Sequence, residues 1–167
     1  VGVAVAGTFG RGTGRLSGLA VATADGPAAW FDPTALDADD EAAVAAWLAD
    51  ATRLKVIHDA KPALLAFTAH GWEFDGLATD TALAAYLAKP DNRSYDLVDL
   101  ALRYLQRELR IEGADEAQPA LDGLASVGGP GEHAVEENLM LRARATLDLV
   151  EAVQAQLGRD GPDAAAA

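Results

Sequence analysis

The spacing of apolar residues changes along this chain, and the change restricts its fold more than any other feature. Up to residue 31 the apolar residues alternate or form short runs, which lie at 1–5, 16–22 and 28–31. Such runs, with the turn pair Asp25-Gly26 before the last of them, are typical of antiparallel strands. Beyond residue 37 most apolar residues recur at helical spacing instead. The first part of the chain therefore predicts three short antiparallel strands, followed by a region rich in helices.

Helix and strand signals alternate after these three strands. Asp37 can cap a helix over 38–49, because its carboxylate can accept hydrogen bonds from the free amides of the first turn. The apolar run 54–57 predicts a buried strand, and Pro62 suits the first turn of a following helix that ends at Gly71. Further signals predict a strand at 77–79 and helices at 81–87, from a Ser94 cap to Leu109, and at 139–157. This order favours an α/β fold with a mixed βββαβα sheet flanked by helices.

One domain is predicted to occupy residues 1–158. A chain of 167 residues, half of them apolar and none of them cysteine, can bury a core without disulfides or thiolate metal sites. Between about 112 and 133 the apolar period is lost and Gly, Pro, Ala and acidic residues dominate, which predicts a flexible insertion. Residues 159–167 predict a linker toward a further domain. Because the chain begins at Val1, we expect a piece of a longer protein.

The charge of the chain restricts its partners. Its formal net charge of -13 opposes free-standing nucleic-acid binding, which depends on Lys and Arg side chains that neutralise phosphates. No apolar stretch is long enough to cross a bilayer, so we expect a cytoplasmic protein without a membrane partner. Arg103, Arg107 and Arg110 fall on one face of a predicted helix and can contact DNA or a neighbouring domain, although a solvated face is the simpler interpretation.

Two other features point away from a cofactor site. The glycine-rich stretch GTFGRGTG at 7–14 joins two predicted strands and lacks the pattern of a phosphate-binding loop, which favours a hairpin loop. The three histidines, His58, His70 and His133, lie on separate predicted elements without the clustered spacing of a zinc site. Structural or solvated histidines are the simpler interpretation.

Three segments between residues 55 and 110 together resemble a known family. They are HDAK at 58–61, GWEFDGLATDTALAAYL at 71–87 and SYDLVDLALRYLQREL at 94–109. In order and spacing they are similar to the motifs H-N-x-K-x-D, F-D-T-x-L-x-x-Y-L and S-x-x-L-x-x-L-A-x-R-Y-L of the 3′-5′ exonuclease domain of bacterial DNA polymerase I, a family A polymerase. The details most resemble actinobacterial members. The resemblance implies a ribonuclease-H-like fold, in agreement with the predicted βββαβα order.

The resemblance also implies catalytic residues, and this chain lacks them. In proofreading members, carboxylates from three segments hold two divalent metals, and a tyrosine orients the attacking water. The first pair of acids would stand around residues 5–8, but no acid precedes Asp25. The second acid matches Ala63, while the tyrosine and the last acid match Asn138 and Arg142. We therefore expect neither a catalytic residue nor a metal ligand at these degenerate positions.

The resemblance leaves three functions open. We favour a catalytically inactive, exonuclease-like structural domain of a DNA polymerase I. Its partner would be the polymerase domain of the same chain, which would bind magnesium and connect this domain to DNA in replication and repair. A residual metal-dependent nuclease could instead use Asp59, Asp80 and acids of the predicted insertion. A module that docks onto DNA or protein is the third hypothesis.

Overall fold

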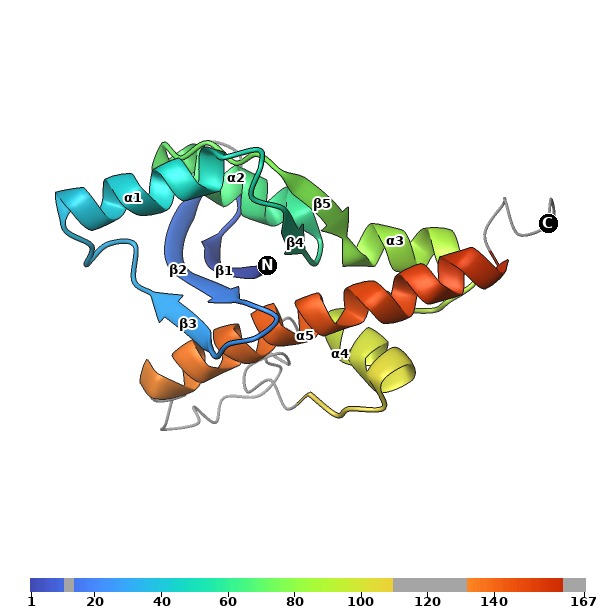
Figure 1. Cartoon of the computed structure of the whole chain (residues 1–167). Helices are drawn as coiled ribbons and strands as arrows, with labels where there is room; N and C mark the ends of the chain where they lie inside the picture. The colour runs from blue at the N-terminus through green and yellow to red at the C-terminus, as the bar shows by residue number, and fades with distance from the viewer. Residues whose placement is uncertain (11–13, 110–131, 161–167) are drawn as a thin grey trace.

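The computed structural model describes residues 1–10, 14–109 and 132–160 (Figure 1). The strands are β1 (Gly2–Thr8), β2 (Arg15–Ala22), β3 (Ala28–Phe31), β4 (Lys55–Ile57) and β5 (Leu77–Asp80). The helices are α1 (Ala38–Ala49), α2 (Ala60–His70), α3 (Thr81–Ala88), α4 (Leu97–Leu100), the π-helical segment η1 (Ala101–Leu105) and α5 (Glu132–Asp160). This order confirms the predicted succession of three strands followed by alternating helices and strands.

Within the described residues, the strands form one mixed sheet in the order β3-β2-β1-β4-β5. β1 pairs antiparallel with β2, as at Val5 and Leu19, and β2 pairs antiparallel with β3. On the other side of β1, strands β4 and β5 add in parallel. The three predicted antiparallel strands are thus confirmed. Strands β1, β4 and β5 run parallel to one another, so their carboxyl ends lie at the same end of the sheet. The candidate site begins at this end.

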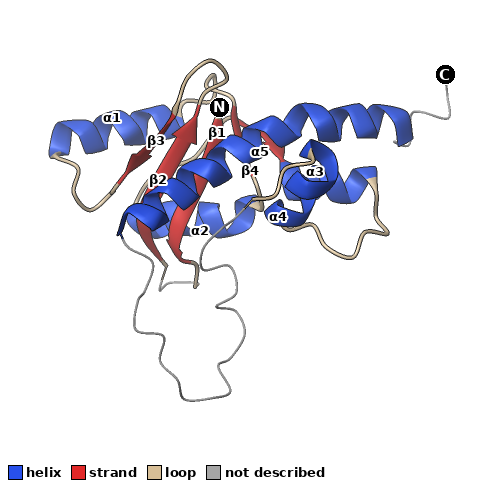
Figure 2. Cartoon of the chain, turned by 90° about the horizontal axis from the view of Figure 1, so that it is seen from below, coloured by secondary structure: helices blue, strands red, loops and turns tan. Residues whose placement is uncertain are grey.

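Helices cover both faces of this sheet (Figures 1 and 2). On one face α1 and α2 pack against the strands around Val3, Leu48 and Phe67, which are almost fully buried. On the other face α5 crosses the sheet, and a Cβ on Gly2 would lie only 2.2 Å from the carbonyl oxygen of Ala143. The lack of a side chain at Gly2 therefore lets α5 approach the central strand closely.

Local signals set the ends of the first two helices. The Asp37 carboxylate accepts hydrogen bonds from the amides of Asp39 at 3.0 Å and Asp40 at 2.9 Å, which confirms the predicted cap of α1. Pro62 lies in the first turn of α2, as predicted. This helix ends at Gly71, whose φ of 88° lies in the left-handed region that glycine adopts without strain.

A second apolar cluster lies beyond the edge of the sheet. There α3, α4 and η1 pack against the C-terminal half of α5 around Ala85, Leu100, Leu149 and Val153. Helix α5 is 29 residues long, so it joins this cluster to the sheet. Neither α5 nor any other helix in the described part of the chain is long and apolar enough to cross a membrane.

The helix predicted from a Ser94 cap to Leu109 is wrong at both ends. It begins at Leu97, because Ser94 instead closes a turn in which its hydroxyl accepts the amide of Asp96 at 3.1 Å. It ends at Leu105, and the following Gln106 has a left-handed φ of 52°. This turn brings Leu109 into the second cluster, where it is 7% exposed, so tertiary packing overrides the helical spacing.

The boundaries of α5 also differ from the prediction. The helix begins at Glu132 instead of Leu139, so the last two residues of the predicted insertion are helical. It extends to Asp160, and residues 159–160 therefore continue the helix rather than start a linker. The remainder of the predicted insertion, 112–131, and of the predicted linker, 161–167, lies outside the described residues.

Candidate functional site

The degenerate positions lie on helices that flank the central strand β1. Ala63 is in α2, which packs on the same face of the sheet as α1. Asn138 and Arg142 lie one turn apart in α5, which packs on the opposite face. Residues 5–8 of β1 are Val, Ala, Gly and Thr, none of which carries a carboxylate. The positions expected to hold acids therefore surround β1, but their side chains are of other types.

Ala63 is part of the apolar core. The residue is 2% exposed and belongs to the cluster that contains Val3, Leu16 and Phe67. A carboxylate at this position would leave water for an apolar environment, which disfavours the charged form. Residue 63 therefore contributes packing in this chain.

Asp80, at the end of β5, caps two helices at once. Its carboxylate oxygens accept hydrogen bonds from the amides of Asp59 at 3.1 Å, Ala60 at 2.9 Å, Ala82 at 3.0 Å and Leu83 at 3.3 Å. The amides of Asp59 and Ala60 lie at the start of α2, and those of Ala82 and Leu83 lie at the start of α3. The side chain of Asp59 makes no cap bond in α2, and its φ of 54° is left-handed. Asp80 thus ties together the starts of both helices.

His58 follows β4 directly and lies in the same region. Its Nδ1 is 2.9 Å from Oγ1 of Thr81, a residue that is fully buried. Burial is the main reason that the pKa of His58 lies below its ordinary value, and Asp80 opposes the shift while Arg142 adds to it. The imidazole is therefore held in its neutral form by its surroundings near neutral pH.

Arg142 places a positive charge where the resemblance implies a metal ligand. Burial lowers the pKa of its guanidinium, and the carboxylate of Asp96 opposes this shift. An arginine nevertheless stays protonated in proteins, so it repels a divalent cation. Arg142 also acts on the pKa of His58, which places side chains from α5 and from the end of β4 within electrostatic reach of each other.

The residues present do not fit the two-metal group that the resemblance implies. In the ranges that the structure describes, no three His, Asp or Glu side chains form a group that could hold a metal ion. Asp80 is engaged with four amides, Ala63 has no ligand atom, and Arg142 is cationic. Two divalent ions about 4 Å apart require several carboxylates at once.

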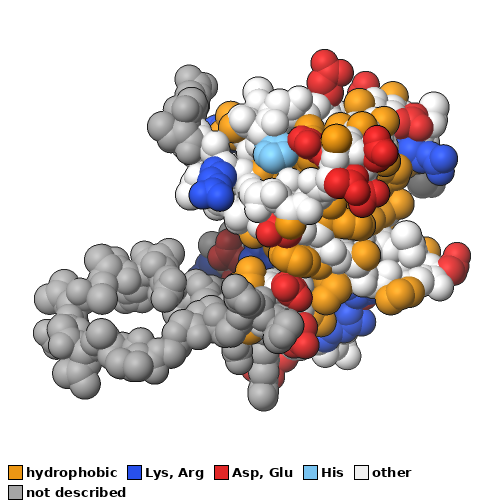
Figure 3. Space-filling model, turned by 90° about the vertical axis from the view of Figure 1, so that its left-hand side faces the viewer, with side chains coloured by type: hydrophobic (Ala, Val, Ile, Leu, Met, Phe, Trp, Pro, Cys, Tyr) orange, Lys and Arg blue, Asp and Glu red, His pale blue; other side chains and the backbone are white. Residues whose placement is uncertain are grey.

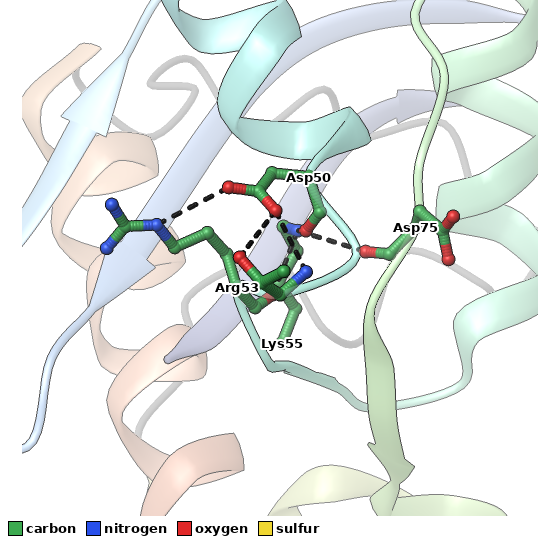
Figure 4. Close-up of polar contacts among 5 residues, drawn as sticks. Asp50, Arg53, Lys55 and Asp75 are labelled. Carbon is green, nitrogen blue, oxygen red and sulfur yellow. Dashed lines mark hydrogen bonds and ion pairs between the residues drawn. The ribbon is translucent and has the colours of Figure 1, made fainter.

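A buried lysine joins the loops at the opposite end of β4 (Figure 4). Lys55 has no exposed surface, and its Nζ donates at 2.9 Å to the carbonyl oxygens of Asp50, Arg53 and Asp75. Burial lowers the pKa of Lys55, while the charges of Asp50 and Asp75 oppose that shift. The ammonium group thus connects the end of α1, the loop before β4 and the loop before β5.

The three arginines predicted to share a helix face are separated. Arg103 is exposed on η1, whereas Arg107 lies beyond the turn at Gln106 and donates to Asp148 of α5 at 2.8 Å. Arg110 lies outside the described residues. The prediction that these arginines share a helix face is therefore wrong, because the helix ends at Leu105, before Arg107. Acidic side chains are scattered over the face shown in Figure 3, with few basic ones, in agreement with the net charge of -13.

The sequence of this chain is similar to those of known proteins. Residues 13–114 match the family described as DNA polymerase I, ribonuclease H-like domain. The chain belongs to this family. The DNA polymerase I of Mycobacterium tuberculosis is 44% identical over 158 residues, which are 95% of this chain and 17% of the relative. The Mycobacterium leprae enzyme is 45% identical over 156 residues, with 93% and 17% covered. The chain thus spans about a sixth of the length of these curated relatives, 17%.

Solved structures agree with this exonuclease-like domain of DNA polymerase I. The POL domain of Pol1 from M. smegmatis, in complex with DNA primer-template and dNTP, has a TM-score of 0.78 at 39% identity, covering 95% of this chain and 24% of that chain. Brucella melitensis NrnC bound to pGG has a TM-score of 0.68 at 18% identity, covering 95% and 74%. The second similarity shows the fold alone. Together they confirm the predicted ribonuclease-H-like α/β fold.

The structural roles of Asp80 and Lys55 escaped the sequence prediction. The bonds from Asp80 to Ala82 and Leu83 are local, but those to the amides of Asp59 and Ala60 cross 21 and 20 residues and leave no local pattern. Lys55 did leave a signal, because it is a charged residue inside the apolar run 54–57. A lysine on a buried strand requires acceptors close by, and backbone carbonyls supply them here.

Proposed function

We propose that this chain is a catalytically inactive, exonuclease-like domain of a bacterial DNA polymerase I and serves that enzyme as a structural domain. The proposal depends on the residue types that stand where the resemblance implies metal ligands. Ala63 is packed in an apolar cluster, and Arg142 brings a positive charge to a position where the family has an acid. Residues 5–8 supply no carboxylate either. A two-metal mechanism fails without these ligands, because the metals stabilise both the attacking and the leaving oxygen.

The acids that remain near the site have a structural use that needs no metal. Asp80 holds the first turns of α2 and α3 through four amide bonds. The neutral form of His58 is favoured by burial, as its lowered pKa indicates, and its ring contacts Thr81. The fold around the former site is therefore supported by hydrogen bonds between protein groups, which is what a structural domain requires.

The chemistry of the intact protein would lie in the polymerase domain of the same chain. That domain would extend DNA from a primer with deoxynucleoside triphosphates and magnesium, whereas this domain would need no cofactor. The relatives named DNA polymerase I and the mycobacterial structure with primer-template and dNTP support this assignment. Contact between this domain and DNA would then come through the parent protein, since the net charge of -13 opposes independent binding.

Release of labelled 3′ nucleotides from single-stranded DNA tests the proposed inactivity. The chain is supplied with excess magnesium or manganese, and parallel reactions contain a chelator or lack the protein. We expect release no faster than in the reaction without protein. Release that the chelator abolishes would instead support a residual nuclease. Asp59→Asn is the informative variant in that case, because the Asp59 side chain is exposed and caps no helix.

A further inference from the structure

Helix α3 turns its small side chains inward and its large apolar side chains outward. The side chains buried by the rest of the domain are those of Thr81, Ala85 and Ala88. Leu83 and Leu87 are each 56% exposed, and Tyr86 is 48% exposed. Because residues three and four apart are neighbours on a helix surface, these three side chains form one continuous surface, the α3 stripe.

The composition of α3 is that of a helix covered on both sides. Its sequence, TALAAYLA, has no charged residue, so the outer face lacks the polar side chains that a solvated helix carries. A helix that is apolar all round is normally buried within a protein. Among the residues that the structure describes, the domain covers only one side of α3, through α5 and the second cluster. The outer side therefore has the chemistry of an interface.

One aromatic side chain of the stripe is already ordered. The ring of Tyr86 meets the ring of Tyr95 edge to face, with 5.5 Å between the centroids. The Tyr95 hydroxyl donates in turn to the carbonyl oxygen of Lys89 at 2.9 Å, which fixes the position of its ring. A side chain that is held in place before binding loses less conformational entropy on binding. Tyr86 is therefore suited to act as an anchor.

We propose that the α3 stripe is the surface through which this domain docks onto the polymerase domain of the same chain, an inference that rests on the proposed function. The curated relatives are much longer than the matched region, which is 17% of the M. tuberculosis enzyme. The C-terminal half of α5 packs beside α3 (Figure 1). A polypeptide that continues from α5 in an intact polymerase therefore leaves the domain beside α3, the helix that carries the stripe. DNA does not fit this uncharged surface, because phosphates require cationic side chains.

Hydrogen exchange of the α3 amides tests the docking surface. In the intact polymerase these amides should exchange about tenfold more slowly, or slower still, than in this chain alone, because burying a single leucine contributes at least a tenfold factor. The double variant Leu83→Ser and Leu87→Ser should lose this difference. Leu141→Ser is the matched control, since Leu141 is 48% exposed on α5 and lies outside the stripe, and it should keep the difference.

Two results would overturn the docking proposal. One is equal exchange of the α3 amides in the isolated chain and the intact polymerase. The other is an equal loss of protection in the Leu141→Ser control. Circular dichroism of the isolated variants checks that the exposed substitutions leave the fold unchanged. Chelator-sensitive nucleotide release by the same proteins would refute the proposed inactivity but not the docking, so the two failures are distinguishable.

Discussion

Replacing Lys55 with methionine is expected to lower the free energy of unfolding by about 3 kcal/mol. Methionine preserves much of the unbranched stem, so the packing changes little, but it removes the ammonium group. In the structure that group donates at 2.9 Å to the carbonyl oxygens of Asp50, Arg53 and Asp75. The substitution therefore leaves three backbone acceptors without their donor, and it separates three segments that the lysine joins.

The magnitude follows from these three acceptors. A buried carbonyl that loses its partner costs about 1–3 kcal/mol, and we take the lower value because water can reach the partly exposed loops, which gives about 3 kcal/mol in total. The variant no longer buries a charged group, and this change by itself stabilises the folded state. The loss of the ammonium contacts with the rings of Trp47 at 5.1 Å and Phe74 at 5.5 Å, about 0.5–1 kcal/mol each, offsets that relief. The melting temperature should fall by about 6–12 °C.

Guanidinium unfolding followed by circular dichroism measures this change. Lys61→Met is the matched control, since Lys61 is exposed in the first turn of α2, and it should change the free energy by less than about 0.5 kcal/mol. The slope of the unfolding free energy against guanidinium concentration should be the same in the wild type, Lys55→Met and Lys61→Met. A Lys55→Met protein as stable as the wild type would refute the idea that the ammonium joins the loops.

Acidification should weaken the fold through His58. Burial holds its folded pKa below the ordinary 6.5, so the unfolded chain binds the proton first, and stability is lost as the pH falls from about 6.5 through the folded pKa. In the variant His58→Gln, the free energy of unfolding should depend less on pH over that range. An unchanged slope of this free energy against pH would contradict the prediction. Asp80→Ala should cost about 2–4 kcal/mol in chemical denaturation because it uncaps two helices, whereas Asp37→Ala uncaps one and should cost about 1 kcal/mol. Equal costs would show that the double cap is not used. Ala63→Asp alone and Arg142→Asp alone should release no labelled 3′ nucleotide, because a two-metal site needs its ligands together. Activity from either single variant would show that other ligands remain.

The spacing of apolar residues was sufficient to predict the order of the elements. The alternating segment formed three antiparallel strands, and the caps at Asp37 and Gly71 acted within one turn of their own helices. Such signals are local, so they are visible in sequence. The resemblance pointed to Ala63 and Arg142, which the structure places on α2 and α5, the two helices that flank β1. Predictions from local signals depend on short spacings that the fold preserves.

Contacts between distant segments escaped prediction. Nothing in the sequence shows that Asp80 reaches back to the start of α2, or that Lys55 binds a carbonyl 20 residues away in Asp75. The end of the helix before Gln106 was missed for a similar reason, because the burial of Leu109 depends on α5. Because the helix was predicted to be longer than it is, Arg103 and Arg107 were wrongly predicted to share one of its faces. Tertiary packing decides such features, and a single sequence does not record it.

Manganese binding is the most direct test of the central claim that the former site has lost its metal cage. Free manganese is measured by electron paramagnetic resonance as the ion is titrated into this chain. We expect no saturable binding up to millimolar concentration, because Ala63 offers no ligand, Arg142 repels cations, and the Asp80 carboxylate is engaged with four amides. Stoichiometric binding that Asp59→Asn or Asp80→Asn abolishes would contradict the claim.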